Sequence, residues 1–82
     1  MISIVNTLKS SINVSFSIIS DSSNDYDIIR KIADENKCIK FSCYKCSPSK
    51  YYYEIIFRTK NEKYENFEKQ IKGSKEYTDS LK

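Results

Sequence analysis

The segment from Tyr51 to Thr59 constrains the fold more than any other part of this sequence. Aromatic and β-branched residues fill it, and these residue types are enriched in strands. Because successive side chains of a strand point to opposite faces, Glu54 and Arg58 share one face, which we expect to point outward. The opposite face, which we expect in the core, consists of Tyr51, Tyr53, Ile55 and Phe57.

Two further segments show the same alternation. From Ile12 to Ile18, apolar residues alternate with asparagine and serine, which predicts a half-buried strand. From Ile39 to Tyr44, the alternation predicts another strand. Proline and serine at positions 46–50 favour a turn between this strand and the one that begins at Tyr51. We therefore expect residues 39–59 to form a β-hairpin.

Two other segments have apolar residues at helical spacing. The first helix is expected from Asp25 to Asn36, after a polar cluster that can cap it. The second is expected after Asn61, and it carries a narrow apolar stripe on a charged background. Gly73 lies at the end of this second helix, where a residue in the left-handed conformation is expected.

These elements predict one small α+β domain, since 82 residues leave room for a single core. Their order is that of a ferredoxin-like βαββα(β) fold, in which two helices cover one face of an antiparallel-containing sheet. Residues 12–73 form the expected domain. We expect residues 1–11 to be an N-terminal arm, and residues 74–82 to be a weakly ordered tail or a short edge strand.

Composition argues against catalysis. The chain has no histidine, which removes the commonest general base and excludes Ser-His and Cys-His nucleophile pairs. Cys43 and Cys46 have the spacing of half a zinc site, but no second pair and no histidine accompany them. We therefore expect no enzyme activity, no cofactor and no metal site. A zinc ion shared between the Cys43/Cys46 pairs of two copies is the alternative.

Composition also bears on location. An odd number of cysteines, three, fits reduced thiols better than a disulfide framework. No apolar run approaches the ~20 residues of a membrane-spanning helix, and the N-terminus has no secretory signal pattern. We expect a cytoplasmic protein with no direct membrane insertion.

The outward face of the predicted hairpin is the candidate binding surface. Aromatic rings among cations on an open sheet are what single-stranded nucleic-acid binders use, and residues 38–60 carry a net charge of +4. An open sheet edge also invites pairing with another chain. The residues that we expect to bind a partner are Lys40, Tyr44, Tyr52, Ile56 and Arg58.

With this order of elements, the chain resembles small ACT-type regulatory domains. The segment Asn13–Ile19 leads into a helix, a hairpin and a second helix, as in the cytoplasmic ACT-like tail of MgtC-type bacterial membrane proteins. The resemblance covers about residues 12–73, rests on the pattern of elements, and implies a regulatory role.

We thus predict a non-enzymatic regulatory or protein–protein interaction domain that acts through an open sheet face or edge. Its partner is expected to be another protein or a second copy in a homodimer. A phage- or plasmid-type inhibitor of a host protein fits the same description. The alternative is a single-stranded nucleic-acid-binding module.

Overall fold

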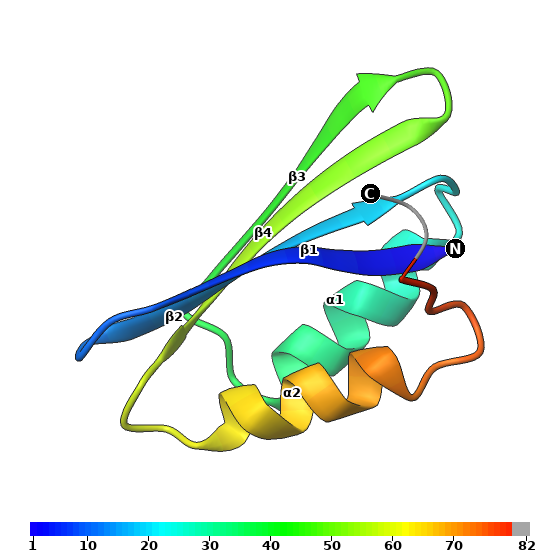
Figure 1. Ribbon diagram of the computed structural model, residues 1–82. Coiled ribbons are helices and arrows are strands. Elements are labelled where there is room, and N and C mark those ends of the chain that lie inside the picture. The colour runs from blue at the N-terminus through cyan, green and yellow to red at the C-terminus, as the bar shows by residue number, and fades with distance from the viewer. Residues whose placement is uncertain (80–82) are drawn as a thin grey trace.

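The structure, a computed structural model, describes residues 1–79. The chain forms a four-stranded antiparallel sheet, and two helices pack against one of its faces (Figure 1). In chain order the elements are β1 (Ile2–Lys9), β2 (Asn13–Ser20), α1 (Asp25–Glu35), β3 (Lys40–Ser47), β4 (Lys50–Arg58) and α2 (Lys63–Lys72).

The α+β class and the placement of both helices on one sheet face are confirmed, but the order of elements is ββαββα. The sheet order is β1-β2-β4-β3, so β1, at the N-terminal end of the chain, is the edge strand beside β2. The segment that we expected to be an arm, residues 1–11, contains β1, whose Ile2 and Ile4 are buried. An irregularity between Ile4 and Asn6 shifts the register, and this interruption hides the alternation from a reading of the sequence.

The C-terminal segment of the described chain holds the outer edge of β1. The Ile2 amide donates to the Glu76 carbonyl at 2.6 Å, and the Thr78 amide donates to the Ile2 carbonyl at 2.8 Å. An isolated parallel bridge joins Ile2 and Tyr77. Within residues 1–79, the expected final strand is thus reduced to this one bridge, and residues 80–82 of the expected tail lie outside the described residues.

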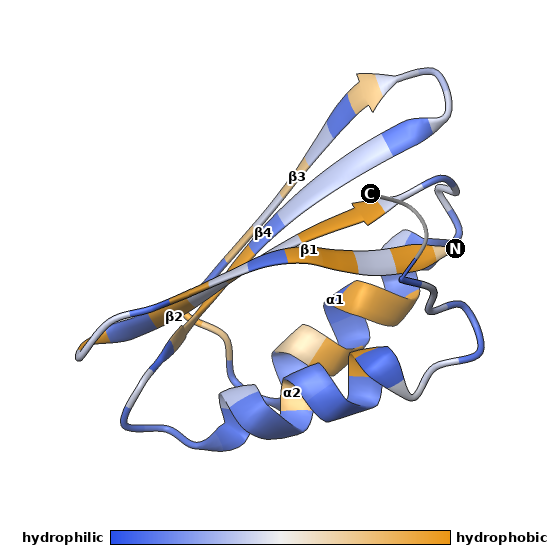
Figure 2. Cartoon of the chain, in the orientation of Figure 1, coloured by the Kyte–Doolittle hydropathy of each residue, from blue (hydrophilic) through white to orange (hydrophobic). Residues whose placement is uncertain are grey.

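The core lies between the sheet and the helices, and aromatic rings form its centre. The Phe67 ring on α2 lies 5.2 Å from that of Phe16 and 4.8 Å from that of Phe57, between ring centroids. The predicted orientation of β4 is confirmed, since Tyr53, Ile55 and Phe57 are fully buried. Figure 2 shows hydrophobic residues concentrated along β1 and β2, whereas most of α2 is hydrophilic.

Helix α1 ends in a Schellman motif, in which two amides return to carbonyls of the last turn. The Cys38 amide donates to the Ala33 carbonyl, and the Lys37 amide donates to the Asp34 carbonyl, both at 3.1 Å. Lys37 has a φ of 59°, in the left-handed region. Gly73, where the sequence led us to expect this conformation, has a φ of −85°, so that expectation is wrong.

Replacing Lys37 with glycine is expected to raise the free energy of unfolding by about 0.5–1 kcal/mol. A left-handed conformation costs a residue with a Cβ about 1–2 kcal/mol, and the greater freedom of glycine in the unfolded chain offsets part of that gain. Urea unfolding of Lys37→Gly measures the effect. The control is Lys31→Gly within α1, which is expected to lower stability by about 1 kcal/mol. A loss of stability in Lys37→Gly would contradict the assigned motif.

Candidate functional site

The outer face of the sheet, opposite the helices, brings residues from all four strands into register. Antiparallel pairing places side chains from neighbouring strands beside one another in rows across this face. The pairing of the strands defines three such rows: Leu8, Ser15, Ile56 and Lys40; Asn6, Ser17, Glu54 and Ser42; and Ser3, Ile19, Tyr52 and Tyr44.

All five sequence-predicted residues lie on this outer face. Lys40 of β3 is the register partner of Ile56 on β4, and Tyr44 is that of Tyr52. Arg58 pairs with Asn13 of β2, one row beyond Ile56. The hairpin turn occupies only positions 48 and 49, and an irregularity of β3 between Lys45 and Ser47 shifts the pairing by one residue to give this register.

The Tyr44–Tyr52 pair is the aromatic part of the outer face. The ring centroids are 6.4 Å apart and the ring planes meet at 33°. The Tyr52 hydroxyl donates to the Ser17 hydroxyl at 3.1 Å, which fixes Tyr52 against β2. Tyr44 remains 57% exposed. In this pair, the Tyr52 ring is fixed by a hydrogen bond and the Tyr44 ring is exposed to solvent.

Leu8 is an exposed apolar residue of this face that the sequence did not reveal. It is 64% exposed and lies in one row with Ile56, at a hollow of about 380 Å³. Leu8 reaches the outer face because β1 resumes its alternation after the irregularity that follows Ile4. Sequence alternation alone could have found it only if that irregularity had been recognised. The hollow is lined by Leu8, Lys9, Ser10, Asn13, Ser15, Glu54 and Ile56.

Charge on the outer face is mixed. Glu54 lies in the middle row, between the tyrosine row and the row that contains Lys40. Within residues 1–79, Glu54 has no cation within ion-pair distance. Cations and aromatic rings are therefore not direct neighbours here, because a carboxylate separates the two rows. In the tyrosine row itself, Ser3 and Ile19 are buried.

The three cysteines lie on or next to β3. Cys38 and Cys43 are half-buried, Cys46 is exposed at an irregularity of β3, and all three thiols are free. Burial raises the pKa of the Cys38 thiol, which disfavours its nucleophilic thiolate form. Within residues 1–79, no three side chains of the types that ligate metals come close enough together to hold an ion.

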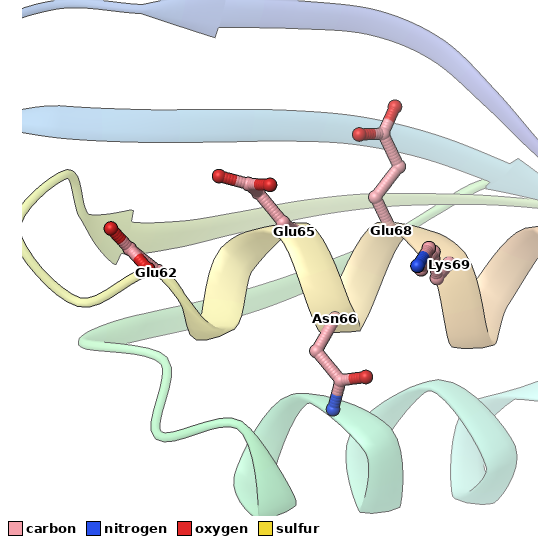
Figure 3. Close-up of a pocket in the computed structure, with 5 residues that line it drawn as sticks. All are labelled: Glu62, Glu65, Asn66, Glu68 and Lys69. Carbon is pink, nitrogen blue, oxygen red and sulfur yellow. The ribbon is translucent and has the colours of Figure 1, made fainter.

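A second hollow, of about 400 Å³, lies along α2 (Figure 3). In Figure 3 the carboxylates of Glu65 and Glu68 point away from Asn66, which points toward α1, and Glu62 lies just before the start of α2. The Asn66 amide donates to Asn36 Oδ1 at 2.8 Å and so joins the two helices. Helix α2 and the residue before it supply the whole lining, and Lys72 pairs with Glu68 at 3.2 Å, so this hollow is an ordinary solvated helix surface.

Neither helix within residues 1–79 is long and apolar enough to cross a membrane. Searches with this chain matched no protein-family model, no curated protein and no solved structure.

Proposed function

We propose that this protein is a non-enzymatic regulatory or protein-interaction domain that binds its partner through the outer sheet face and the adjoining edge. The observation that carries the proposal is a sheet face that neither helix covers (Figure 1) and that exposes Tyr44 and Leu8. Tyrosine is enriched where proteins contact one another, because it buries a large apolar ring and keeps a polar tip. Ile56 and Tyr52 extend this surface toward the centre of the sheet.

The order of strands in the sheet supports the regulatory part of the proposal. In a ferredoxin-like βαββαβ domain, a C-terminal strand fills the edge beside the first strand. Here β1 occupies the edge beside β2, and the order β2, β4, β3 across the rest of the sheet is that of the split βαβ unit. We therefore propose a ferredoxin-like sheet whose edge strand comes from the other end of the chain, which keeps the ACT-like regulatory domain as the nearest functional analogy.

Truncation of two outer-face residues tests the proposal. The double variant Tyr44→Ala/Ile56→Ala is expected to weaken partner binding by about 30-fold or more, since the loss of even one central anchor costs about 2 kcal/mol in many interfaces. The measurement is affinity capture from the producing cells with the wild-type chain and the variant, followed by titration of each protein that only the wild type retains.

The matched control removes two exposed side chains from the helices, in the double variant Lys31→Ala/Lys63→Ala. This control is expected to bind as the wild type does. Circular dichroism establishes that both variants are folded. If the folded Tyr44→Ala/Ile56→Ala variant captures and binds the same proteins as the wild type, the outer face is not the interface.

The runner-up function, single-stranded nucleic-acid binding, has the Tyr44–Tyr52 pair and Lys40 in its favour. The carboxylate of Glu54 between the two rows counts against it, since it repels phosphate. Salt separates the two functions, because affinity that depends on phosphate contacts falls steeply as salt rises. Titration of a labelled oligothymidylate at 50 and 200 mM salt is expected to show no binding of this kind.

A further inference from the structure

The two edges of the sheet differ in what covers them. On the outer side of β1, backbone hydrogen bonds join Ile2 to Glu76 and Thr78, and the strand is irregular after Ile4. A strand that approached this edge would have to displace the C-terminal segment and match the irregularity. The start of the β1 edge is therefore covered by the chain itself, and the irregularity after Ile4 makes the rest a poorer template for pairing.

The β3 edge is uncovered. Within residues 1–79, β3 pairs only with β4, over the register from Lys40 to Ser47. Figure 1 shows the β3–β4 hairpin extending beyond both helices. Since alternate backbone amides and carbonyls of an edge strand point away from its sheet, β3 offers a template for one more strand.

The charge of this edge is of one sign. Between residues 36 and 53 the chain carries four lysines and no acidic residue. Lys40 and Lys45 belong to β3 itself, Lys50 begins β4, and Lys37 precedes the strand. All four side chains are exposed. An added strand therefore meets two lysines of β3 itself, Lys40 and Lys45, and the nearest carboxylate of β4, that of Glu54, lies one strand further in, opposite Ser42.

A second copy of the chain is a poor occupant for this edge. Pairing of β3 with β3 would bring two sets of these lysines together, and like charges across a strand pair are destabilising. Lysine on an edge strand is a recognised means of preventing such self-pairing. The same charge attracts a strand that carries carboxylates, so the edge discriminates between the two occupants.

We infer that β3 binds an extended, acidic segment of another protein by strand addition. This inference rests on the proposed function and deepens it by naming the chemistry of the partner. Backbone hydrogen bonds along β3 provide the affinity, and alternate side chains provide the specificity. The bound segment enlarges the sheet from four strands to five.

The side chains of β3 indicate the pattern of the segment. Lys40 and Lys45 are five residues apart, so their side chains point to opposite faces of the sheet. Two carboxylates at the same separation in the ligand can each lie beside one lysine. Between them, Phe41 and Cys43 are half-buried on the helix side and Tyr44 is exposed on the outer face, which favours apolar or β-branched neighbours.

A peptide of this pattern tests the inference with the full chain. The probe is an acetylated and amidated eight-residue peptide of alternating valine and threonine, with two glutamates five positions apart. The control peptide has lysine in place of both glutamates. We expect the acidic peptide to bind at least about tenfold more tightly. It is also expected to shift the backbone amides of Lys40–Ser47 and to protect from hydrogen exchange those that do not already bond to β4, as measured by NMR of the ¹⁵N-labelled chain.

Charge reversal on the protein provides the reciprocal experiment. The variant Lys40→Glu/Lys45→Glu is expected to bind the lysine peptide in preference to the glutamate peptide. The variant Lys31→Glu/Lys63→Glu changes the net charge by the same amount on the two helices, and is expected to keep the wild-type preference. This pair separates local pairing at β3 from attraction by the overall charge.

Equal binding of the two peptides, or amide shifts that leave Lys40–Ser47 unchanged, would overturn the inference. A dimer of the wild-type chain in sedimentation, with β3 amides that shift when the dimer is diluted, would overturn it as well. An oligonucleotide that shifts the β3 amides with steep salt dependence would also overturn it. Neither equal peptide binding nor amide shifts outside β3 bears on the Tyr44→Ala/Ile56→Ala capture experiment. If that experiment succeeds while the peptides fail, the proposed function stands without strand addition.

Discussion

Replacement of Phe67 by alanine is expected to lower the free energy of unfolding by about 3–5 kcal/mol, the range for a fully buried phenylalanine. Phe67 is fully buried, and its ring contacts those of Phe16 and Phe57. Only two other residues of α2, Tyr64 and Ile71, are buried, so the helix is held to the sheet by a narrow stripe. Domains of this size have about 5–15 kcal/mol of stability in total, so the variant is expected to be close to unfolded at 37 °C.

Urea unfolding followed by circular dichroism measures this loss. The change in the free energy of unfolding is taken from the shift of the midpoint, with the same m-value for both proteins. The control is Lys69→Ala, an exposed position on the same helix, which is expected to change stability by no more than about 0.5 kcal/mol. A loss below about 1 kcal/mol in Phe67→Ala would mean that α2 does not close the core as the structure shows.

The outward residues of the hairpin could be predicted from the sequence, but their exact pairing could not. Glu54 and Arg58 decide which face of β4 points outward, and the alternation from Lys40 to Tyr44 decides it for β3. The two-residue turn at positions 48 and 49 would by itself place Tyr44 opposite Tyr53. The irregularity of β3 between Lys45 and Ser47 shifts the pairing by one residue, so Tyr44 lies opposite Tyr52.

The N-terminal edge could not be predicted in the same way. Alternation in β1 breaks between Ile4 and Asn6, so the segment shows neither the period of a strand nor that of a helix. Its place beside β2 depends on burial of Ile2 and on contacts with Tyr77, which is distant in sequence. Leu8 was missed as an outer-face residue for the same reason.

The left-handed residue at a helix end is a third feature that the sequence did not predict correctly. Glycine is the usual residue in the left-handed position after a helix, so Gly73 was the natural choice. In the structure this conformation falls on Lys37, because the chain must turn sharply there from α1 into β3. Tertiary geometry placed the motif, and composition alone gave no sign of it.

Removal of residues 1–10 is expected to abolish cooperative folding. The deletion takes away two buried isoleucines, Ile2 and Ile4, each worth about 2–5 kcal/mol when its side chain is lost. It also uncovers the edge of β2, whose Phe16 and Ile18 are fully buried at the centre of the sheet. The two isoleucines alone account for about 4–10 kcal/mol, which together with the uncovered edge of β2 is comparable to the about 5–15 kcal/mol of a whole domain. Thermal unfolding followed by circular dichroism is expected to show no transition.

A circular permutant shows whether β1 matters for its position in the sheet or for its position in the sequence. The permutant begins at Ser11 and joins Lys82 to Met1 through a short glycine–serine linker, which gives the βαββαβ order. The Thr78 amide already donates to the Ile2 carbonyl at 2.8 Å, so the last described residues and the start of β1 are adjacent. We expect it to fold into the same sheet, at a cost of about 1–3 kcal/mol for the lost turn, in which the Asn13 amide donates to Ser10 Oγ at 3.0 Å.

Nuclear Overhauser contacts between Ile4 and Ile18, which are paired across β1 and β2, identify the native sheet in the permutant. A folded permutant beside an unfolded deletion means that the sheet requires a strand at this edge and accepts it from either end of the chain. This result would relate the fold to the ferredoxin-like arrangement by a change of connectivity alone. If the permutant does not fold, the β1–β2 hairpin is needed as a local unit, and the likeness in strand order does not extend to how the sheet forms.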